Sequence, residues 1–323
     1  MSARNNQAFF DGYLDSLITQ RKLSPHTVSS YSRDLAELSA FADALAGSSA
    51  VTSITHFHIR KFAAHLHAKG LSARSIARKL SSWRGFFDWL SGQASLASNP
   101  VDGVKAPKRS KPLPKALAAD DAVQLVAKPH PGKDPEAATQ RCNRAMFELL
   151  YSSGLRVSEL TGLDARYTQE AGHVSSGWID FDACEVTVTG KGGKMRSVPI
   201  GQPAMRAIAD WLAVRATLVK SNLGGDSFAL FLTERGTRMS PRVVQLRLKA
   251  HAQALGIPAD VHPHVLRHSF ASHVLQSSGD LRAVQEMLGH ASIAATQVYT
   301  SLDFQRLAQV YDAAHPRAKK RDK

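Results

Sequence analysis

Residues 262–270 read HPHVLRHSF, a stretch that predicts a helix with two basic side chains on one face. Apolar residues recur at helical spacing over roughly 263–276. His264 and Arg267 stand three positions apart, and side chains at that separation lie on the same helix face. On its own, this HxxR pattern does not define a function.

The chain around this stretch mixes helices with a small sheet. Strands are predicted over 177–182, 185–189 and 195–200. The turn at 189–194 reads TGKGGK, which suits a hairpin because glycine supplies the backbone conformations that tight turns need. Residues 164–176 have no apolar period and are expected to form a surface loop. Further helical patterns cover roughly 120–128, 136–152, 155–162, 203–221, 241–254 and 281–288. Residues 119–315 are therefore predicted to form one domain that contains both helices and strands.

Residues 1–97 predict a small all-α domain with four helices. Apolar residues recur at helical spacing from Phe9 to Leu17. Ser24 is placed to cap a second helix, in which Pro25 takes the first position. Gly70 is placed to end a third helix, and Ser72 to cap a fourth. The predicted fold class is mainly α with a small β-sheet, in two domains.

Positive charge is concentrated outside the second domain. The chain has a formal net charge of +14, of which residues 1–100 carry +5, residues 101–118 +4 and the tail 316–323 +4. Residues 98–118 are rich in proline and basic residues, so we predict an extended, exposed linker between the domains. A polyanion held between the first domain, the linker and the second domain would explain this distribution. A basic surface that only aids solubility is the alternative.

Composition excludes several classes of protein. The longest apolar runs are far shorter than the ~20 residues that span a bilayer, and the first residues do not resemble a secretory signal. Cys142 and Cys184 are the only cysteines, with no CxxC pair, so neither a disulfide framework nor a structural zinc is expected. We expect a cytoplasmic protein.

Three further stretches carry residues suited to phosphate chemistry. Residues 154–160 read GLRVSEL, with Arg156 at the start of a helical pattern. The hairpin turn carries Lys191 without the spacing of a Walker A loop. His290 follows Leu-Gly, and Tyr299 comes nine residues later in TQVYT. Taken singly, these residues have ordinary explanations: a surface ion pair, a β-turn and a packing tyrosine.

Together these stretches resemble the tyrosine recombinases, also called phage-integrase-type recombinases. The family signature is Arg, Lys, HxxR, His or Trp, and Tyr, in that chain order. The resemblance covers nearly the whole chain, and residues 299–321 are similar to the C-terminus of the members that resolve chromosome dimers. It implies an all-α, SAM-like DNA-binding domain followed by an α+β catalytic domain. The loop 164–176 is longer than in compact members, which puts a loop contact in doubt. The implied catalytic residues are Arg156, Lys191, His264, Arg267, His290 and the nucleophile Tyr299.

The resemblance also implies a role for each residue. Tyr299 attacks a DNA phosphodiester, forming a 3′-phosphotyrosyl link and a free 5′-hydroxyl. Arg156 and Arg267 clamp the nonbridging oxygens, since a guanidinium group matches phosphate in a bidentate way. Lys191 protonates the departing 5′-oxygen. His264 serves acid–base transfer for Tyr299, and His290 hydrogen-bonds the phosphate.

No cofactor is expected. The sequence shows no carboxylate cluster beside these residues, so a two-metal site would lack ligands. The phosphotyrosyl link conserves the energy of the broken bond, so neither ATP nor Mg²⁺ is needed. The linker residues expected to contact DNA are Lys105, Lys108, Arg109 and Lys111.

The implied partners are duplex DNA at a specific site, a related recombinase in a cyclic heterotetramer, and a DNA translocase as activator. Residues 302–315 predict a short helix with an apolar face. This helix could pack on its own domain, whereas the resemblance implies docking on a neighbouring subunit. Three alternative functions remain: a phage or integron integrase, a type IB topoisomerase, and a non-catalytic architectural DNA-binding protein.

Overall fold

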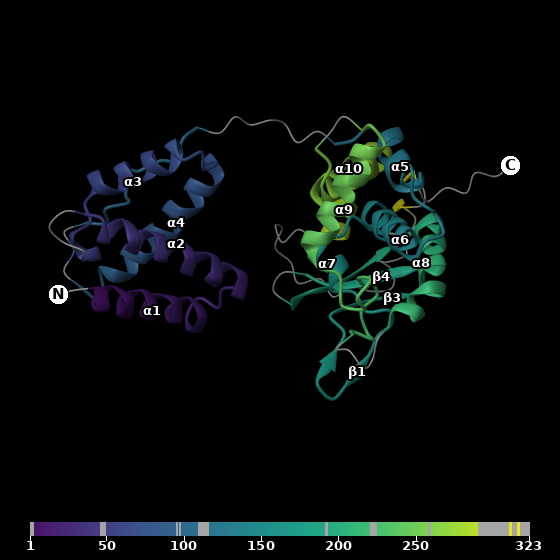
Figure 1. Ribbon diagram of the computed structural model, residues 1–323, viewed down its shortest axis with the longest axis horizontal. Coiled ribbons are helices and arrows are strands. Elements are labelled where there is room, and N and C mark those ends of the chain that lie inside the picture. The colour runs from purple at the N-terminus through teal and green to yellow at the C-terminus, as the bar shows by residue number, and fades with distance from the viewer. Residues whose placement is uncertain are drawn as a thin grey trace. The chain divides into compact units, whose positions relative to one another are not determined.

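The computed structural model describes residues 3–45, 50–94, 96, 98–108, 116–190, 193–219, 225–257, 260–289, 310–311 and 315–316. The chain divides into two compact units, residues 1–112 and 113–323. Each unit has a hydrophobic core of its own. Figure 1 shows the helices and strands of both units. Among the described residues, no helix combines the length and apolar character needed to cross a membrane.

The first unit is a bundle of four helices. They are α1 (Ala3–Thr19), α2 (Pro25–Asp43), α3 (His56–Ala68) and α4 (Ala73–Leu90), with a 3-10 turn at Val51–Ser53. The predicted caps form: the side chain of Ser24 accepts from the Thr27 amide, and that of Ser72 from the Ser75 amide. Helix α4 packs against the other three helices. Its apolar face therefore closes the core.

A buried ionic cluster joins α2 to α4. Asp34 is fully buried on α2. Its carboxylate pairs with Arg78 and, at 3.2 Å, with the ammonium of Lys79, both on α4. The indole of Trp83 donates to the Asp34 carbonyl at 2.8 Å. A buried carboxylate is tolerated only when it is paired in this way, so the cluster fixes how the two helices face each other.

The segment predicted as an exposed linker begins inside the first unit. Val101 and Val104 are buried in its core. The Arg84 guanidinium donates to both of their carbonyls at 3.3 Å, and the Asn99 amide donates to the Arg84 carbonyl at 3.0 Å. Residues 99–104 thus pack on the bundle, because burial of two valines outweighs the basic, proline-rich character of the surroundings.

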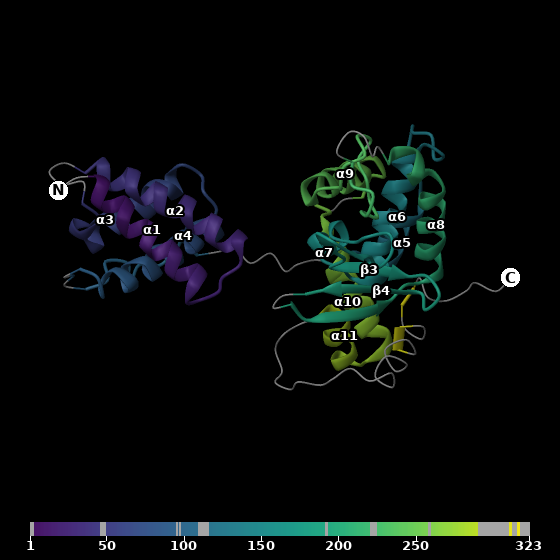
Figure 2. The same ribbon diagram turned by 90° about the horizontal axis from the view of Figure 1, so that it is seen from below.

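The second unit builds its helices around α6 (Ala138–Ser153), which is buried almost completely from Ala145 onward. Helix α6 packs against α5 (Ala119–Ala127), α8 (Gln202–Arg215), α9 (Pro241–Ala254) and α10 (Pro263–Ser278). Figures 1 and 2 both show α6 and α8 side by side. The short helix α7 (Val157–Thr161) follows α6 directly, and α11 (Leu281–Leu288) follows α10.

An antiparallel sheet completes this unit. It has the order β3 (Gly177–Asp180), β4 (Glu185–Thr189) and β5 (Met195–Pro199). The register pairs Val188 with Arg196 and Thr189 with Met195 next to the hairpin turn. Helix α11 packs against both α10 and β5. Figure 2 shows α10 and α11 together beside the strands.

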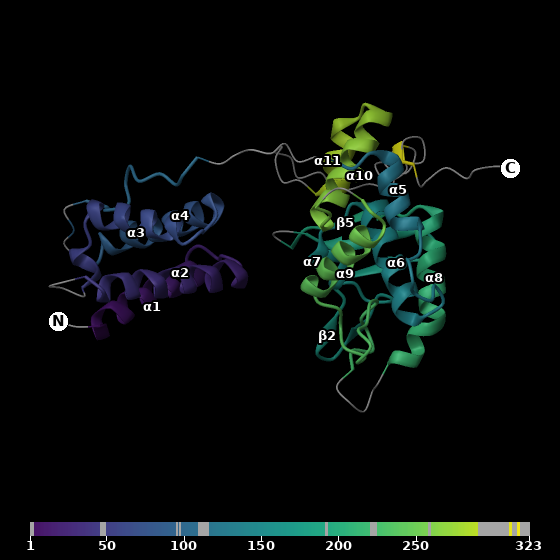
Figure 3. The same ribbon diagram turned by 45° about the horizontal axis from the view of Figure 1, so that its top comes forward.

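The predicted loop 164–176 is not irregular throughout. It contains a two-stranded hairpin, β1 (Gln169–Glu170) and β2 (His173–Val174), which projects from the unit in Figures 1 and 3. Its anchor is the buried carboxylate of Asp164, which His173, Ser175 and Arg238 all hydrogen-bond at 2.6–2.7 Å. Polar contacts hold these strands, so no apolar period marks them in the sequence.

A glycine at the end of α6 sets the path into α7. Gly154 adopts φ +59° and ψ +27°, the left-handed conformation that glycine enters without strain. A methyl group added at Gly154 would lie 2.4 Å from the ring of Phe270 on α10. Both the backbone conformation and the close approach of α10 therefore require glycine here.

We predict that Gly154→Ala destabilises the protein by about 1–3 kcal/mol more than Gly279→Ala. Gly279 ends α10 in the same left-handed conformation, with φ +67°, but an added methyl group would meet nothing within 4 Å. Both variants bear the cost of a left-handed side chain, and only Gly154→Ala adds overpacking, which costs about 1–3 kcal/mol. Urea unfolding measures the difference, and equal losses would contradict the role of the Phe270 contact.

Candidate active site

A buried carboxylate gathers three arginines in the second unit. Glu159 lies on α7, and its side chain is 5% exposed. Arg196 of β5 donates to both carboxylate oxygens, at 2.9 and 2.8 Å. Arg156 donates to one oxygen at 2.8 Å through its guanidinium and to the other at 2.8 Å through its backbone amide. Arg267 of α10 lies 3.9 Å from the same carboxylate.

Arg156 stands where α7 begins, two residues after the left-handed Gly154. Its extended backbone turns the chain from α6 into α7. Its side chain is 32% exposed and is the most accessible of the three arginines. Arg156 therefore combines a fixed attachment to Glu159 with access to solvent.

Arg267 is buried and tied to two backbone segments. Its guanidinium donates to the carbonyls of Gly154 and Leu288, each at 2.6 Å. Burial, together with the charges of Arg156 and Arg196, lowers the pKa of Arg267 to about 10, although Glu159 opposes this shift. The residue remains a cation at neutral pH. It links the end of α6 to the end of α11.

The cluster has more positive than negative charge. Burial by itself would raise the pKa of Glu159, but the hydrogen bonds and charge of Arg196, and the hydrogen bonds of Arg156, lower it below its ordinary value. Glu159 is therefore ionised at neutral pH and offsets one of three guanidinium charges. The remaining positive charge suits an anion such as a phosphodiester.

Of the four other predicted catalytic residues, the structure describes His264. His264 is exposed on the first turn of α10, with its ring centroid 6.0 Å from that of His262. Lys191, His290 and Tyr299 lie outside the described residues. The structure thus brings Arg156 and Arg267 together at Glu159. It leaves Lys191, His290 and Tyr299 as sequence-based predictions.

The proposed DNA-contacting linker residues are also described only in part. Lys105 and Lys108 are exposed. Arg109 and Lys111 lie outside the described residues.

Sequence reasoning missed Glu159 and Arg196. Glu159 stood within the GLRVSEL stretch, three positions after Arg156, where an acidic side chain reaches the start of its own helix. Arg196 shares the buried face of β5 with Val198. Because side chains alternate along a strand, the apolar residue at 198 predicts that the side chain at 196 also points inward. An inward-facing arginine needs a buried anion, and Glu159 supplies it.

Two described residues near the end of the chain, Tyr311 and His315, pack on their own unit. The Tyr311 hydroxyl hydrogen-bonds the Ser152 hydroxyl at 2.5 Å. The His315 ring stacks on Tyr311, with centroids 4.9 Å apart, and hydrogen-bonds the Tyr151 carbonyl at 3.1 Å. Tyr311 and His315 therefore pack on their own domain, because both buried rings find polar or stacking partners at α6. Docking of the segment 302–315 on a neighbouring subunit stays a prediction.

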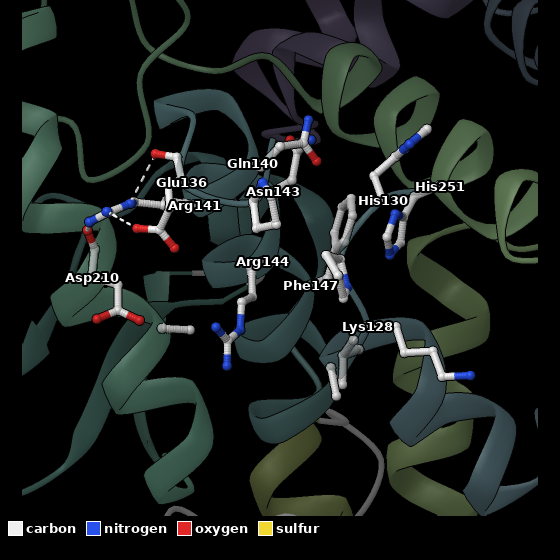
Figure 4. A pocket seen from close by; sticks show the side chains of 15 residues that line it. Lys128, His130, Glu136, Gln140, Arg141, Asn143, Arg144, Phe147, Asp210 and His251 are labelled. Atoms are coloured by element: carbon white, nitrogen blue, oxygen red, sulfur yellow. Dashed lines mark hydrogen bonds and ion pairs between the residues drawn. The ribbon is translucent and has the colours of Figure 1, made fainter. Parts of the chain in front are cut away.

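A separate cavity of about 360 Å³ lies away from this cluster (Figure 4). On one side, Arg141 is turned toward Glu136, which it hydrogen-bonds. Elsewhere on its wall the rings of His130 and His251 lie 5.6 Å apart. None of the three predicted catalytic residues that the structure describes, Arg156, His264 and Arg267, lines this cavity. It therefore does not define the reaction site.

Comparison with known proteins defines the family. Residues 115–306 match the phage integrase family, and residues 10–93 match the phage integrase N-terminal SAM-like domain. Tyrosine recombinase XerC 1 of Ralstonia nicotianae is 56% identical over 311 residues, which cover 96% of this chain and 93% of that protein. Tyrosine recombinase XerC of Alcanivorax borkumensis is 47% identical over 309 residues, with 96% and 94% covered.

The fold also matches a solved structure. The XerH site-specific recombinase bound to a palindromic difH substrate, in a post-cleavage complex, gives a TM-score of 0.64 at 21% identity. The match covers 90% of this chain and 81% of that chain. The chain therefore belongs to the phage integrase family: it is a tyrosine recombinase, an enzyme that cleaves and rejoins DNA. Its XerC relatives match almost the whole length, so it is a XerC-like site-specific recombinase.

We predict that Glu159→Gln destabilises the protein by about 3–5 kcal/mol at pH 7, the usual cost of breaking a buried ion pair. The pKa of Glu159 is lower in the folded chain than its ordinary value of 4.5. The carboxylate thus contributes stability above pH ~4.5 that is lost as the pH falls through the folded pKa. The difference between the two proteins should therefore stay constant from pH 7 to about pH 5 and shrink below pH ~4.5, as measured by urea unfolding between pH 7 and about pH 3.

Glu136→Gln is the matched control for this experiment. Glu136 also pairs with an arginine, but its side chain is 75% exposed. Its loss should cost no more than ~1 kcal/mol, as for other surface pairs. A Glu159→Gln effect that stayed constant down to about pH 3 would show that the ionised carboxylate is not what stabilises the cluster.

Proposed function

We propose that this recombinase resolves chromosome dimers together with a related, XerD-like recombinase, acting at a specific chromosomal site during segregation and cell division. The observation that carries the assignment of its active site is the cluster of Arg156, Arg196 and Arg267 around one carboxylate. Arg156 and Arg267 are the two arginines of the family signature. Their excess positive charge suits the phosphodiester that the enzyme must attack.

In the proposed reaction, the Tyr299 oxygen attacks the scissile phosphate and the 5′-oxygen departs. The phenol is a weak nucleophile at neutral pH, since its ordinary pKa is ~10. Arg156 and Arg267 therefore stabilise the charge that develops on the nonbridging oxygens. Arg156, which is partly exposed, approaches the phosphate directly. Arg267 is more deeply buried than Arg156 and contributes its charge to the site, while hydrogen bonds to two carbonyls hold it in place.

Proton transfer is assigned to the remaining residues. Lys191 donates a proton to the departing 5′-oxygen, and His264 serves acid–base transfer for Tyr299. His290 hydrogen-bonds the phosphate. The exposed position of His264 at the start of α10 supports contact with DNA. Rejoining reverses these steps, when a 5′-hydroxyl from the partner strand attacks the phosphotyrosyl link.

We propose that the chemistry uses no cofactor. Glu159, the carboxylate that the described part of the chain brings to the arginine cluster, already accepts hydrogen bonds from two arginines on both of its oxygens. The protein itself supplies the cations that stabilise the transition state. The energy of the broken phosphodiester bond is retained in the phosphotyrosyl link, so neither nucleotide nor Mg²⁺ is needed.

Recombination exchanges four strands, so four active sites must surround one DNA junction. A closed ring of subunits is the natural symmetry for such an assembly. We therefore propose a cyclic heterotetramer with the XerD-like partner, located in the cytoplasm and activated by a DNA translocase of the FtsK type. The DNA-bound state of the structurally similar XerH recombinase supports the DNA part of this proposal.

We predict that Tyr299→Phe binds DNA with unchanged affinity but forms no covalent adduct. The change deletes one hydroxyl, so the aromatic ring remains while the nucleophile is lost. The measurement is a denaturing gel after incubation with a nicked suicide substrate that carries a candidate chromosomal site. A covalent band from the variant would move the nucleophile to another residue.

We predict that neutralising Lys105, Lys108, Arg109 and Lys111 together flattens the salt dependence of DNA binding. Each phosphate contact contributes about −0.9 to the slope of log K against log salt. If each of the four cations makes one contact, the slope of the variant should be less negative by up to ~4. Filter binding at several salt concentrations measures it. The control neutralises four exposed cations of the second unit: Lys128, Lys133, Arg206 and Arg235. A slope unchanged in the linker variant would make the linker a spacer.

A further inference from the structure

Arg196 is an arginine at the centre of the site that cannot itself contact DNA. Its side chain is only 5% exposed. Three of its N–H groups are engaged inside the protein: two donate to Glu159 and the Nε–H donates to the Met287 carbonyl at 2.8 Å. A guanidinium has five N–H donors, and this fork geometry is one that lysine cannot reproduce.

Through Glu159, Arg196 governs the two signature arginines. The carboxylate accepts from Arg156 at 2.8 Å and lies 3.9 Å from Arg267. Without Arg196, Glu159 would retain these two cations as its partners among the described residues. It would then attract them more strongly and draw them away from a phosphate. The bidentate pair with Arg196 thus keeps the carboxylate in place and leaves the positive charges of Arg156 and Arg267 available to a DNA phosphate.

Arg196 also contacts the end of α11, from which the segment with His290 and Tyr299 continues. Besides the Met287 carbonyl, it lies against Gly289, which caps α11 in the left-handed conformation at φ +62°. A methyl group added at Gly289 would lie 3.0 Å from the Arg196 Cδ. The last described residue before His290 is therefore packed directly on the Arg196 side chain.

The Arg196 side chain also lies close to Gly190, which precedes Lys191 in the chain. Arg196 pairs with Val188 across β4 and β5, next to the turn. A methyl group added at Gly190 would lie 3.5 Å from an Arg196 guanidinium nitrogen. The Gly190 amide also donates to the Lys194 carbonyl at 2.7 Å, which closes the turn. Arg196 thus approaches the residue that immediately precedes Lys191.

We propose that Arg196 is a positioning residue that sets the mutual placement of the phosphate clamp, the Lys191 turn and the start of the His290–Tyr299 segment. The inference rests on the catalytic residues assigned under the proposed function. Arg196 touches neither substrate nor reacting atoms. It acts through Glu159, Gly190 and the end of α11, so its loss impairs catalysis without removing any group that contacts DNA.

The test compares Arg196→Met and Arg196→Lys with the wild-type chain, using a nicked suicide substrate and a fixed amount of the partner recombinase. Cleavage is measured under single-turnover conditions, and DNA affinity by gel shift. We expect Arg196→Met to bind DNA normally and to cleave about 10²-fold more slowly, since a misplacement of about 1 Å has an effect of that size. Arg196→Lys keeps the charge but not the fork, so its rate should lie between the two.

Arg238→Met is the matched control. Arg238 also donates to both carboxylate and carbonyl oxygens, in its case those of Asp164 and Asp226 and those of Thr161 and Leu163, but it lies at the β1–β2 hairpin anchor rather than at the Glu159 cluster. We expect it to lower the melting temperature while the cleavage rate, measured well below that temperature, stays at the wild-type value. A cleavage defect equal to that of Arg196→Met would reduce Arg196 to a general structural role and overturn the proposal.

The outcomes separate the inference from the proposed function. Failure of the wild-type chain to form an adduct would overturn the assigned chemistry. A wild-type adduct together with undiminished cleavage by Arg196→Met would overturn the positioning role alone. If Arg196→Met does not fold, Arg196→Lys decides the matter, and a wild-type rate for that variant would equally contradict the proposal.

Discussion

The buried carboxylate of Glu159 is the constraint on which the arrangement of the site depends. Three guanidinium groups, from the α6–α7 turn, β5 and α10, converge only because this anion lies among them. In a low-dielectric interior such cations would otherwise repel one another strongly. One residue thereby fixes a helix start, a strand and a second helix relative to each other. The carbonyl contacts of Arg267 and Arg196 extend the same framework to the end of α11.

Much of the fold could be predicted from periodicity alone. The patterns over 241–254 and 281–288 correspond to α9 and α11, because apolar spacing directly encodes which helix face is buried. Two segments could not be predicted this way. The β1–β2 hairpin is held by the Asp164 carboxylate, and residues 99–104 by two valines within a basic stretch. Neither kind of contact produces an apolar period in the sequence.

The site divides along similar lines. The chain order of the signature identified Arg156 and Arg267, and the structure brings both to Glu159. The pairing of Glu159 with Arg196 joins residues 37 positions apart and depends on how β5 packs beside α7. No local pattern contains that information. Residues 302–315 raised the same difficulty, since their apolar face suited two docking surfaces. The contacts of Tyr311 and His315 with α6 join residues about 160 positions apart, so no local pattern predicts them.

The lowered pKa of Arg267 has a thermodynamic consequence for the free enzyme. Burial and the nearby charges of Arg156 and Arg196 make this guanidinium costly to keep ionised. A phosphate placed against the cluster would supply a second anion and relieve that cost. An anion that binds this cluster in the folded chain, and not in the unfolded chain, would therefore stabilise the native fold. Affinity for a phosphate and stability of the fold would then be linked.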